Sequence, residues 1–242
     1  MNTTPLDTLL AERFLALRSP LERWRLNGYA RLKRVAWRRL TGGTRRIKRA
    51  FDAAVSLLLL LLLGPLFLVI ALLIKLDDGG PVFFAQTRVG KWGRHFKMFK
   101  FRSMYVDAER RLQELLAHNE HRDGVTFKMK KDPRITRIGK WLRRLSLDEL
   151  PQFINVLWGD MSLVGPRPPV PREVEKYSAA ERRRLMATPG ITGLWQVGGR
   201  AEIDFSGQVQ LDVQYIESQT FWGDVTILLK TIPVVLSGRG AY

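Results

Sequence analysis

The residues best suited to chemistry in this sequence are two adjacent carboxylates, Asp148 and Glu149. The 242-residue chain has no cysteine and three histidines, so carboxylates are the main candidates for a nucleophile or a base. Ser146 and the apolar spacing that follows predict a helix from Leu147 to about Trp158, with Ser146 as its N-cap. Free amides at that helix end and two preceding arginines would keep both carboxylates ionised and would attract phosphate. An ionised Asp can attack phosphorus, as it does in aspartyl-phosphate enzymes.

The pair also has a simpler interpretation, because an Asp-Glu dipeptide at a helix start more often caps the helix and complements its dipole. Basic residues elsewhere favour the chemical interpretation. Arg167 lies inside Gly-Pro-Arg-Pro-Pro and Arg200 follows two glycines. Such loops preset a guanidinium for bidentate phosphate binding. Lys100 and Arg102 add two cations near a long apolar segment. Taken singly, each of these cations is better explained as a solvated surface group.

The long apolar segment, residues 53–74, contains no charged residue. As a straight helix it would be about 33 Å long, which is enough to cross a hydrocarbon core of about 30 Å. Gly64 and Pro65 lie at its midpoint, where proline removes a backbone donor and favours a kink or break. Lys and Arg flank the segment on both sides, which favours both ends remaining on the cytoplasmic face. The pattern leaves two alternatives, a kinked spanning helix or a re-entrant helix-break-helix that enters the membrane and returns.

The formal net charge of +17 is unevenly distributed, with 13 basic and 3 acidic residues among the first fifty. Next to a membrane segment, such a concentration predicts attraction to anionic lipid headgroups. Nucleic acid is the other common partner of a basic protein, but no nucleic-acid-binding motif is present, so we expect none to bind. The polar N-terminus does not resemble a signal peptide. We therefore expect the chain to remain on the inner face of a membrane.

Three regions follow from these patterns. Residues 1–44 form a basic amphipathic arm with Trp24 and Trp37 at interfacial positions. Residues 45–78 form the membrane helix, broken at Gly64-Pro65 in the re-entrant alternative. Residues 79–242 form a cytoplasmic catalytic domain with interfacial helices. Alternating apolar residues around 82–100 predict a small strand element. The expected fold class is α+β and mostly α-helical.

Several segments together give the chain a family resemblance. They are KRAFDAA before the apolar run, PVFFAQTRVG, FKMFKFRSM, the block DPRITRIGKWLRRLSLDELPQFINVLWGDMSLVGPRPP, PGITGLWQVGGR and LDVQYIE. In these segments the chain resembles the bacterial sugar transferases, the monotopic phosphoglycosyl transferases also called polyprenyl-phosphate glycosyl-1-phosphate transferases. The resemblance covers about residues 45–242. Many relatives have Ser-Pro at the membrane break, where this chain has Gly64-Pro65.

The resemblance implies a re-entrant membrane helix and a defined reaction. The family transfers a sugar 1-phosphate from a nucleotide sugar, commonly a UDP-sugar, to polyprenyl phosphate such as undecaprenyl phosphate and releases the nucleoside monophosphate. Asp148 would attack the sugar-bearing phosphorus and form an aspartyl phosphosugar intermediate. Asp148 and Glu149 would also hold Mg²⁺, although whether Glu149 acts as a base or a ligand stays open. The same resemblance places Lys100, Arg143, Arg167 and Arg200 around the phosphates. Arg102, two residues from Lys100, is a further candidate for substrate binding.

The resulting hypothesis is a transferase for the first membrane step of exopolysaccharide, O-antigen or other glycoconjugate synthesis, acting before downstream glycosyltransferases. A homodimer is compatible with the sequence. The alternative from another class is a non-catalytic basic anchor that binds anionic lipids or partner proteins. No residue in the sequence identifies the transferred sugar.

Overall fold

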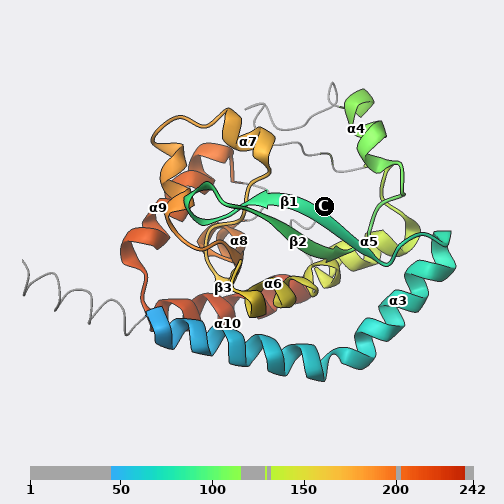
Figure 1. The fold of residues 1–242 in the computed structure, drawn as a ribbon, viewed down its shortest axis with the longest axis horizontal. Helices are drawn as coiled ribbons and strands as arrows, with labels where there is room; N and C mark the ends of the chain where they lie inside the picture. The colour runs from blue at the N-terminus through green and yellow to red at the C-terminus, as the bar shows by residue number, and fades with distance from the viewer. Residues whose placement is uncertain (1–44, 116–128, 130–131, 200–202, 238–242) are drawn as a thin grey trace, which may run out of the picture. The chain divides into compact units, whose positions relative to one another are not determined.

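The computed structural model describes residues 45–115, 129, 132–199 and 203–237. Residues 49–242 form one compact unit, and residues 1–48 form a separate unit of which only the last four residues are described. The predicted basic arm over residues 1–44 lies outside the described residues. Within the described part of the larger unit, helices predominate and two small sheets are present (Figure 1). The expected class, α+β and mostly α-helical, is confirmed.

The apolar segment folds as two helices joined at a bend. The first helix is Arg45–Leu62 and the second, α3, is Gly64–Asp78, with an angle of 61° between them. Pro65 explains the bend. A proline has no N–H to donate to the preceding helical turn, so it interrupts the first helix, but it is tolerated in the first turn of α3. Among the described residues no single helix is long and apolar enough to cross a membrane. The two helices of this bent pair, taken together, are long and apolar enough by length and composition alone. Many of its leucines are exposed: Leu57, Leu58, Leu61, Leu62, Leu68, Leu72 and Leu76.

The predicted strand element is an antiparallel hairpin. Strands β1 (Phe83–Val89) and β2 (His95–Phe101) are joined by the short 3-10 helix η1 (Lys91–Gly93). The register pairs Phe84 with Lys100 and Gln86 with Met98. Directly opposed residues share a face of the sheet, so Lys100 lies on the same face as Phe84, Gln86 and Arg88.

A second sheet was not predicted. It consists of two three-residue strands, β3 (Ser162–Val164) and β4 (Gly190–Thr192), which pair in parallel. The sequence predicts loops there, because both segments are short and rich in glycine and proline. The carboxyl ends of the two strands meet at one edge, where Gly165 N–H donates to Thr192 O at 2.9 Å.

The remaining elements surround these sheets. They are α4 (Ala108–Leu115), α5 (Arg137–Arg144), η3 (Leu147–Glu149), α6 (Gln152–Trp158), α7 (Pro171–Glu175), η4 (Glu181–Met186), α8 (Leu194–Gly198), α9 (Phe205–Ser218) and α10 (Phe221–Ser237). The main core joins β2, α6, β3, α9 and α10 through Met98, Val156, Leu163, Tyr215 and Ile227.

Both ends of the bent helix pair are attached to this core by polar side chains. Near the start of the first helix, Arg49 Nη2 donates to Leu157 O at 2.7 Å, and Asp52 Oδ2 accepts a hydrogen bond from Ser162 Oγ at 2.8 Å. At the end of α3, Asp77 Oδ2 accepts from the backbone N–H of Ile138 at 3.2 Å. The bend lies between these two attachments.

Candidate active site

The two carboxylates lie on a short 3-10 turn and not at the start of a long helix. The residue before the turn, Ser146, is in the left-handed region (φ 54°) and its side chain makes no capping hydrogen bond. The predicted N-cap is therefore wrong, and the helix divides into η3, which carries both carboxylates, and α6, which begins at Gln152. The left-handed residue turns the chain sharply, so that Asp148 is buried with 7% exposure.

Lys100 on β2 contacts both carboxylates. Its Nζ donates to Glu149 Oε1 at 2.6 Å and lies 3.8 Å from Asp148 Oδ2. Asn155 on α6 holds the neighbouring strand backbone, because its side chain donates to Lys97 O at 2.7 Å and accepts from Phe99 N–H at 2.9 Å. This fully buried amide therefore fixes β2 relative to the helix that follows the two carboxylates.

The two carboxylates differ in basicity. Burial raises the pKa of Asp148 to about 6, in spite of the nearby charge of Lys100. Burial also acts to raise the pKa of Glu149, but the charges of Lys100 and Arg167 outweigh it and lower that pKa to about 2. At neutral pH both groups are ionised, and Asp148 is the more basic. It accepts no hydrogen bond from any described residue, which suits a nucleophile.

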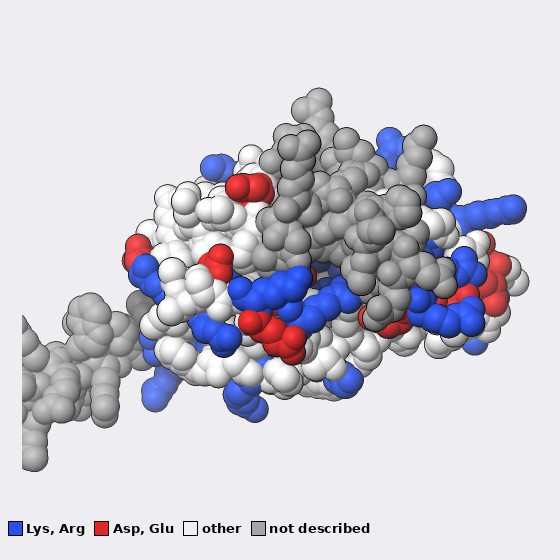
Figure 2. Space-filling model, turned by 90° about the horizontal axis from the view of Figure 1, so that it is seen from above, with Lys and Arg blue, Asp and Glu red and all other residues white. Residues whose placement is uncertain are grey.

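Two more of the expected cations face the same site. Arg143 at the end of α5 and Arg167 both act electrostatically on Asp148. Arg167 is held in a loop whose neighbours are fixed, since Pro166 O accepts from Gly190 N–H at 2.8 Å and Pro169 O accepts from Val89 N–H at 2.9 Å. Figure 2 shows Lys and Arg side chains gathered on one face around a smaller group of Asp and Glu. Arg200 lies outside the described residues.

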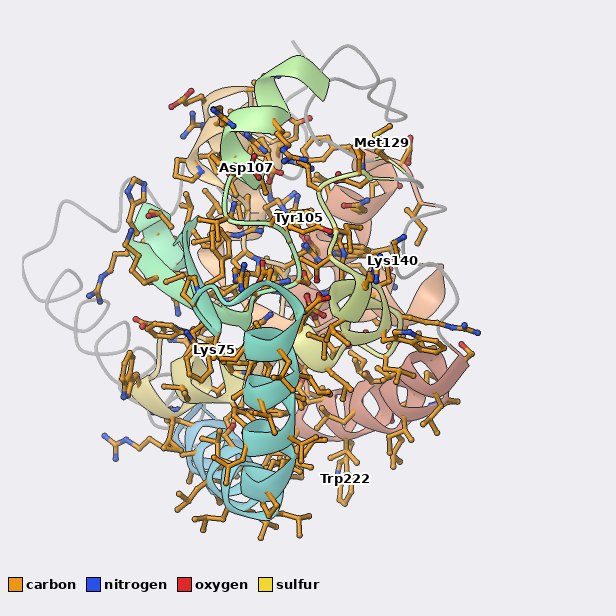
Figure 3. The ribbon with its side chains drawn as sticks, turned by 90° about the vertical axis from the view of Figure 1, so that its right-hand side faces the viewer. Lys75, Tyr105, Asp107, Met129, Lys140 and Trp222 are labelled. Carbon is orange, nitrogen blue, oxygen red and sulfur yellow. The ribbon has the colours of Figure 1, made fainter. Side chains whose placement is uncertain are left out.

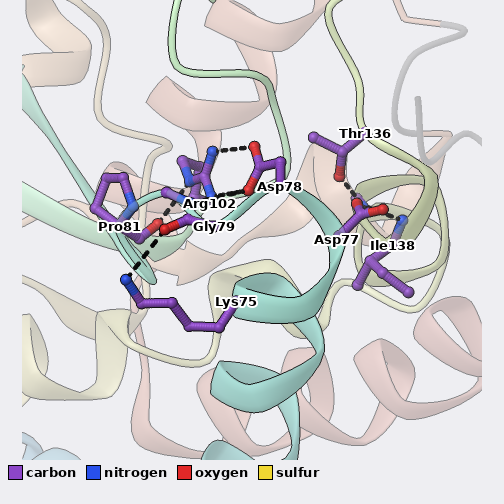
Figure 4. Close-up of polar contacts among 10 residues, drawn as sticks. Lys75, Asp77, Asp78, Gly79, Pro81, Arg102, Thr136 and Ile138 are labelled. Atoms are coloured by element: carbon purple, nitrogen blue, oxygen red, sulfur yellow. Dashed lines mark hydrogen bonds and ion pairs between the residues drawn. The ribbon is translucent and has the colours of Figure 1, made fainter.

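Arg102, expected near the phosphates, has other partners. Its two terminal nitrogens bind the Asp78 carboxylate and its Nε donates to Pro81 O at 2.6 Å (Figure 4). Gly80 packs against the guanidinium so closely that a Cβ there would lie 2.7 Å from Arg102 Nη2. Arg102 thus fastens the end of α3 to β2, two residues from Lys100, and the guanidinium lowers the pKa of Asp78. Together with the hydrogen bond from Ile138 N–H to Asp77, this fixes the end of α3 beside the site.

Substitution of Arg102 is expected to destabilise the protein. Arg102→Met removes the hydrogen bonds of Arg102 to the partly exposed Asp78 carboxylate and to Pro81 O, which should lower the free energy of unfolding by about 1–3 kcal/mol. The double variant Asp78→Leu with Arg102→Met should recover part of the loss, because no charge is left unpaired. Thermal unfolding of the purified protein in detergent measures both effects. Equal stability of wild type and Arg102→Met would contradict this role.

Arg88 is a site residue that sequence analysis missed. It is 9% exposed, yet no described carboxylate lies within ion-pair distance. Its nitrogens donate to Pro168 O at 2.9 Å and to Gln86 Oε1 at 2.7 Å. Burial, with the charge of Arg167 adding to it, lowers the pKa of Arg88 to about 10. A buried cation is costly unless an anion approaches it, so Arg88 is a strong candidate for binding phosphate. Its only sequence signal is a place in the alternating pattern of β1.

These groups line one pocket of about 720 Å³. Ligand sites for small molecules typically occupy some 300–1,000 Å³. Basic and acidic members include Arg88, Lys100, Arg143, Asp148, Glu149 and Arg167; apolar members include Phe83, Phe84, Leu145 and Leu147. Tyr105 and Met129, both labelled in Figure 3, also line it. The apolar members adjoin α3, because Phe101 contacts both Phe83 and Phe67 of α3 with ring centroids 5.3 and 4.9 Å apart.

Asp148 and Glu149 are compatible with a divalent cation. Carboxylate oxygens are the protein ligands that Mg²⁺ prefers, and Mg²⁺ commonly uses one or two of them together with substrate phosphates. No cluster of three or more His, Asp or Glu side chains suited to a metal occurs within the described residues, so a cation here would rely on the pair and on the substrate. Both Asp148 oxygens and Glu149 Oε2 are without hydrogen bonds from the described part of the chain.

A family model described as "Bacterial sugar transferase" matches residues 43–238. The chain belongs to the bacterial sugar transferase family. The resemblance drawn from its motifs is therefore confirmed, and the match includes the two carboxylates, Lys100, Arg143, Arg167 and Arg200.

Similar proteins from this family differ in length and in the sugar that they are named for. The chain is 52% identical over 195 residues to the galactosyl transferase CpsE of Streptococcus agalactiae serotype III, covering 80% of this chain and 43% of that protein. It is 44% identical over 211 residues to the exopolysaccharide production protein ExoY of Rhizobium meliloti, covering 84% of this chain and 92% of ExoY. It is 41% identical over 211 residues to the UDP-glucose:undecaprenyl-phosphate glucose-1-phosphate transferase of Escherichia coli, covering 84% and 43%. The chain thus spans about two fifths of two of these transferases and nearly all of ExoY.

Proposed function

We propose that this bacterial sugar transferase transfers a hexose 1-phosphate from a UDP-sugar to polyprenyl phosphate, with release of UMP. The observation that carries the proposal is the buried, basic Asp148 carboxylate, which has a pocket of substrate size before it and the cations Lys100 and Arg167 beside it. The names of the similar proteins support the reaction class, and we propose galactose or glucose, the sugars for which two of them are named, as the candidates for this chain.

The reaction proceeds in two displacements on one phosphorus atom. An Asp148 oxygen attacks the sugar-bearing phosphorus, and the bond from that phosphorus to UMP breaks, with the electron pair leaving on the UMP oxygen. An oxygen of polyprenyl phosphate then attacks the same phosphorus, and the bond to Asp148 breaks to restore the carboxylate. Lys100, Arg167 and Arg88 bind the phosphates and offset their charge, which is the main contribution a protein can make to such a transfer.

Mg²⁺ held by Asp148 and Glu149 would neutralise charge on the diphosphate. Lys100 already occupies Glu149 Oε1, which leaves Oε2 for the metal or for a proton. We expect chelation with EDTA to stop turnover and added Mg²⁺ to restore it.

The lipid substrate approaches, in this proposal, from the side of α3. The apolar members of the pocket adjoin that helix through the ring contacts of Phe101. A water-soluble nucleotide sugar and a lipid phosphate must meet at the membrane interface, and the polar and apolar members of the pocket suit one substrate each. The protein would therefore act at the cytoplasmic face of the bacterial inner membrane, with anionic lipids near its basic surface.

The bent helix pair acts, in this proposal, as a re-entrant membrane anchor. Support comes from its two attachments: Arg49 and Asp52 hold one end to the domain, and Asp77 and Asp78 hold the other. Two ends fixed to one domain belong on one side of a bilayer. In Figure 3, Trp222 of α10 lies at the lower edge together with the outer side of the helix pair, as an interfacial anchor would. Residues 79–242 would then form the cytoplasmic catalytic domain, with residues 45–78 as its anchor.

Cysteine labelling tests this topology directly, because the natural chain contains no cysteine. Single variants Ala50→Cys and Lys75→Cys should both react with an impermeant maleimide in inside-out vesicles and neither in right-side-out vesicles. Leu62→Cys, next to the bend, should be protected in both preparations. Labelling of Ala50→Cys and Lys75→Cys from opposite sides would establish a spanning helix.

The proposed function itself is tested by UMP release. Purified protein in detergent is incubated with UDP-galactose or UDP-glucose, Mg²⁺ and undecaprenyl phosphate. Release that requires the lipid, together with a lipid-linked sugar diphosphate as product, supports the proposal. Absence of release and product with both donors would favour a non-catalytic membrane anchor.

A further inference from the structure

Unsatisfied polar atoms are concentrated in the wall of the pocket. In the described part of the chain, five buried side-chain nitrogen or oxygen atoms lack a hydrogen-bond partner, and four of them belong to residues that line this pocket. They are Nε of Arg88, Nε of Arg184, Nε1 of Trp195 and Oε1 of Gln196. Buried polar groups are nearly always hydrogen-bonded, so such a concentration indicates a ligand that completes them.

Trp195 and Gln196 lie close to the loop that carries Arg167, although they are distant from it in sequence. They follow β4, and Arg167 follows β3, so both segments leave the same edge of the parallel sheet. The two segments touch at glycines: a Cβ on Gly193 would lie 2.6 Å from Gly165 O and 2.8 Å from Gln196 Oε1. The amide oxygen of Gln196 therefore lies where the two loops meet, next to Gly193. On the other side of this contact is Gly165, which precedes Arg167 by two residues.

The orphan atoms are chemically suited to hydroxyl groups. Trp195 offers an N–H donor and is 7% exposed, whereas Gln196 offers an acceptor. A sugar hydroxyl donates one hydrogen bond and accepts others, so a polyhydroxylated ring can satisfy both. The phosphorus that Asp148 attacks is bonded directly to the sugar. Because Asp148 and Arg167 line the same pocket as Trp195 and Gln196, a hexose attached to that phosphorus is within the pocket that these side chains line.

We propose that Trp195 and Gln196 form the hexose subsite for the donor and determine which sugar is accepted. Gln196 Oε1 accepts a hydrogen bond from one hydroxyl of the hexose, and the indole N–H of Trp195 donates to the oxygen of another. This inference rests on the proposed function, because it assigns part of the same pocket. Galactose and glucose differ only in the orientation of one hydroxyl, so one side chain that contacts it can separate them.

The experiment compares UDP-galactose and UDP-glucose as donors, with lipid-dependent UMP release as the assay. If wild type prefers one hexose, Gln196→Met should lower kcat/KM for that donor by roughly tenfold to a hundredfold and bring the two donors within about threefold of each other. Gln196→Glu keeps an acceptor oxygen and should retain more of the preference. Trp195→Phe removes only the indole N–H and should lower kcat/KM for the preferred UDP-hexose by a smaller factor. Gln214→Met and Trp92→Phe, both exposed and outside the pocket, serve as matched controls.

Inhibition by UMP separates the hexose from the nucleoside. UMP lacks the hexose, so its inhibition constant should stay within about twofold of wild type in Gln196→Met, which adds no charge to the pocket. If UMP inhibits the variant more weakly while the ratio of kcat/KM for the two UDP-hexoses is unchanged, the proposal is overturned. The unsatisfied polar atoms would then contact the uracil. An unchanged ratio together with unchanged UMP inhibition would also overturn it. Wild type inactive with every donor would instead refute the proposed function.

Discussion

Replacement of Asp148 by Asn should abolish sugar phosphate transfer. Asparagine has the same shape but no nucleophilic carboxylate, so the lipid-dependent release of UMP should fall by at least about 10³-fold. The fold should survive, because burial raises the pKa of this carboxyl and an uncharged group is accommodated there more easily. We therefore expect a melting temperature equal to or above that of wild type.

The matched control for this variant is Asp160→Asn. Asp160 lies outside the pocket and follows α6, so its substitution should change turnover less than about twofold. Vesicle flotation should recover both variants with the membrane fraction, since neither residue belongs to the bent helix pair. Residual turnover of Asp148→Asn above one tenth of wild type would exclude this residue as the nucleophile.

Replacement of Arg88 should separate activity from stability. Arg88→Met removes a buried cation that lacks a described carboxylate partner, so the free energy of unfolding should be unchanged or higher by up to about 2 kcal/mol. Turnover should fall by roughly 10²–10³-fold, because the diphosphate loses a preorganised donor in a water-poor site. UMP release and thermal unfolding on the same preparations provide both measurements.

Arg102→Met is the comparison variant for the stability of Arg88→Met. Both arginines are buried, Arg88 in β1 and Arg102 directly after β2, but Arg102 has Asp78 as an ion-pair partner and Arg88 has no carboxylate partner within the described residues. The same substitution should therefore destabilise the protein at residue 102 and not at residue 88. Strong destabilisation by Arg88→Met would show that Arg88 has a mainly structural role.

The sequence predicts those parts of the site that depend on local pattern. Adjacent carboxylates, an arginine between prolines and an alternating apolar pattern are visible without a structure. The strand element around residues 82–100 and the presence of a break in the apolar segment were both predicted correctly.

What the sequence does not predict depends on contacts between distant residues. Arg88 and Arg102 look alike in sequence, but one contacts Pro168, 80 residues away, and the other Asp78, 24 residues away. Ser146 has the right neighbours for an N-cap, yet its positive φ prevents that geometry. The strands β3 and β4 are three residues long, too short for alternation to be visible, so the place of Gln196 next to the Gly165 loop could not be expected.

The most direct test of the aspartyl intermediate is the intact mass of the protein after incubation with a UDP-hexose and Mg²⁺ in the absence of polyprenyl phosphate. We predict an increase equal to one hexose phosphate, which is absent from Asp148→Asn and is lost again when polyprenyl phosphate is added. An unmodified mass, alongside UMP release that still depends on the lipid, would contradict the aspartyl intermediate and indicate direct transfer between the two substrates.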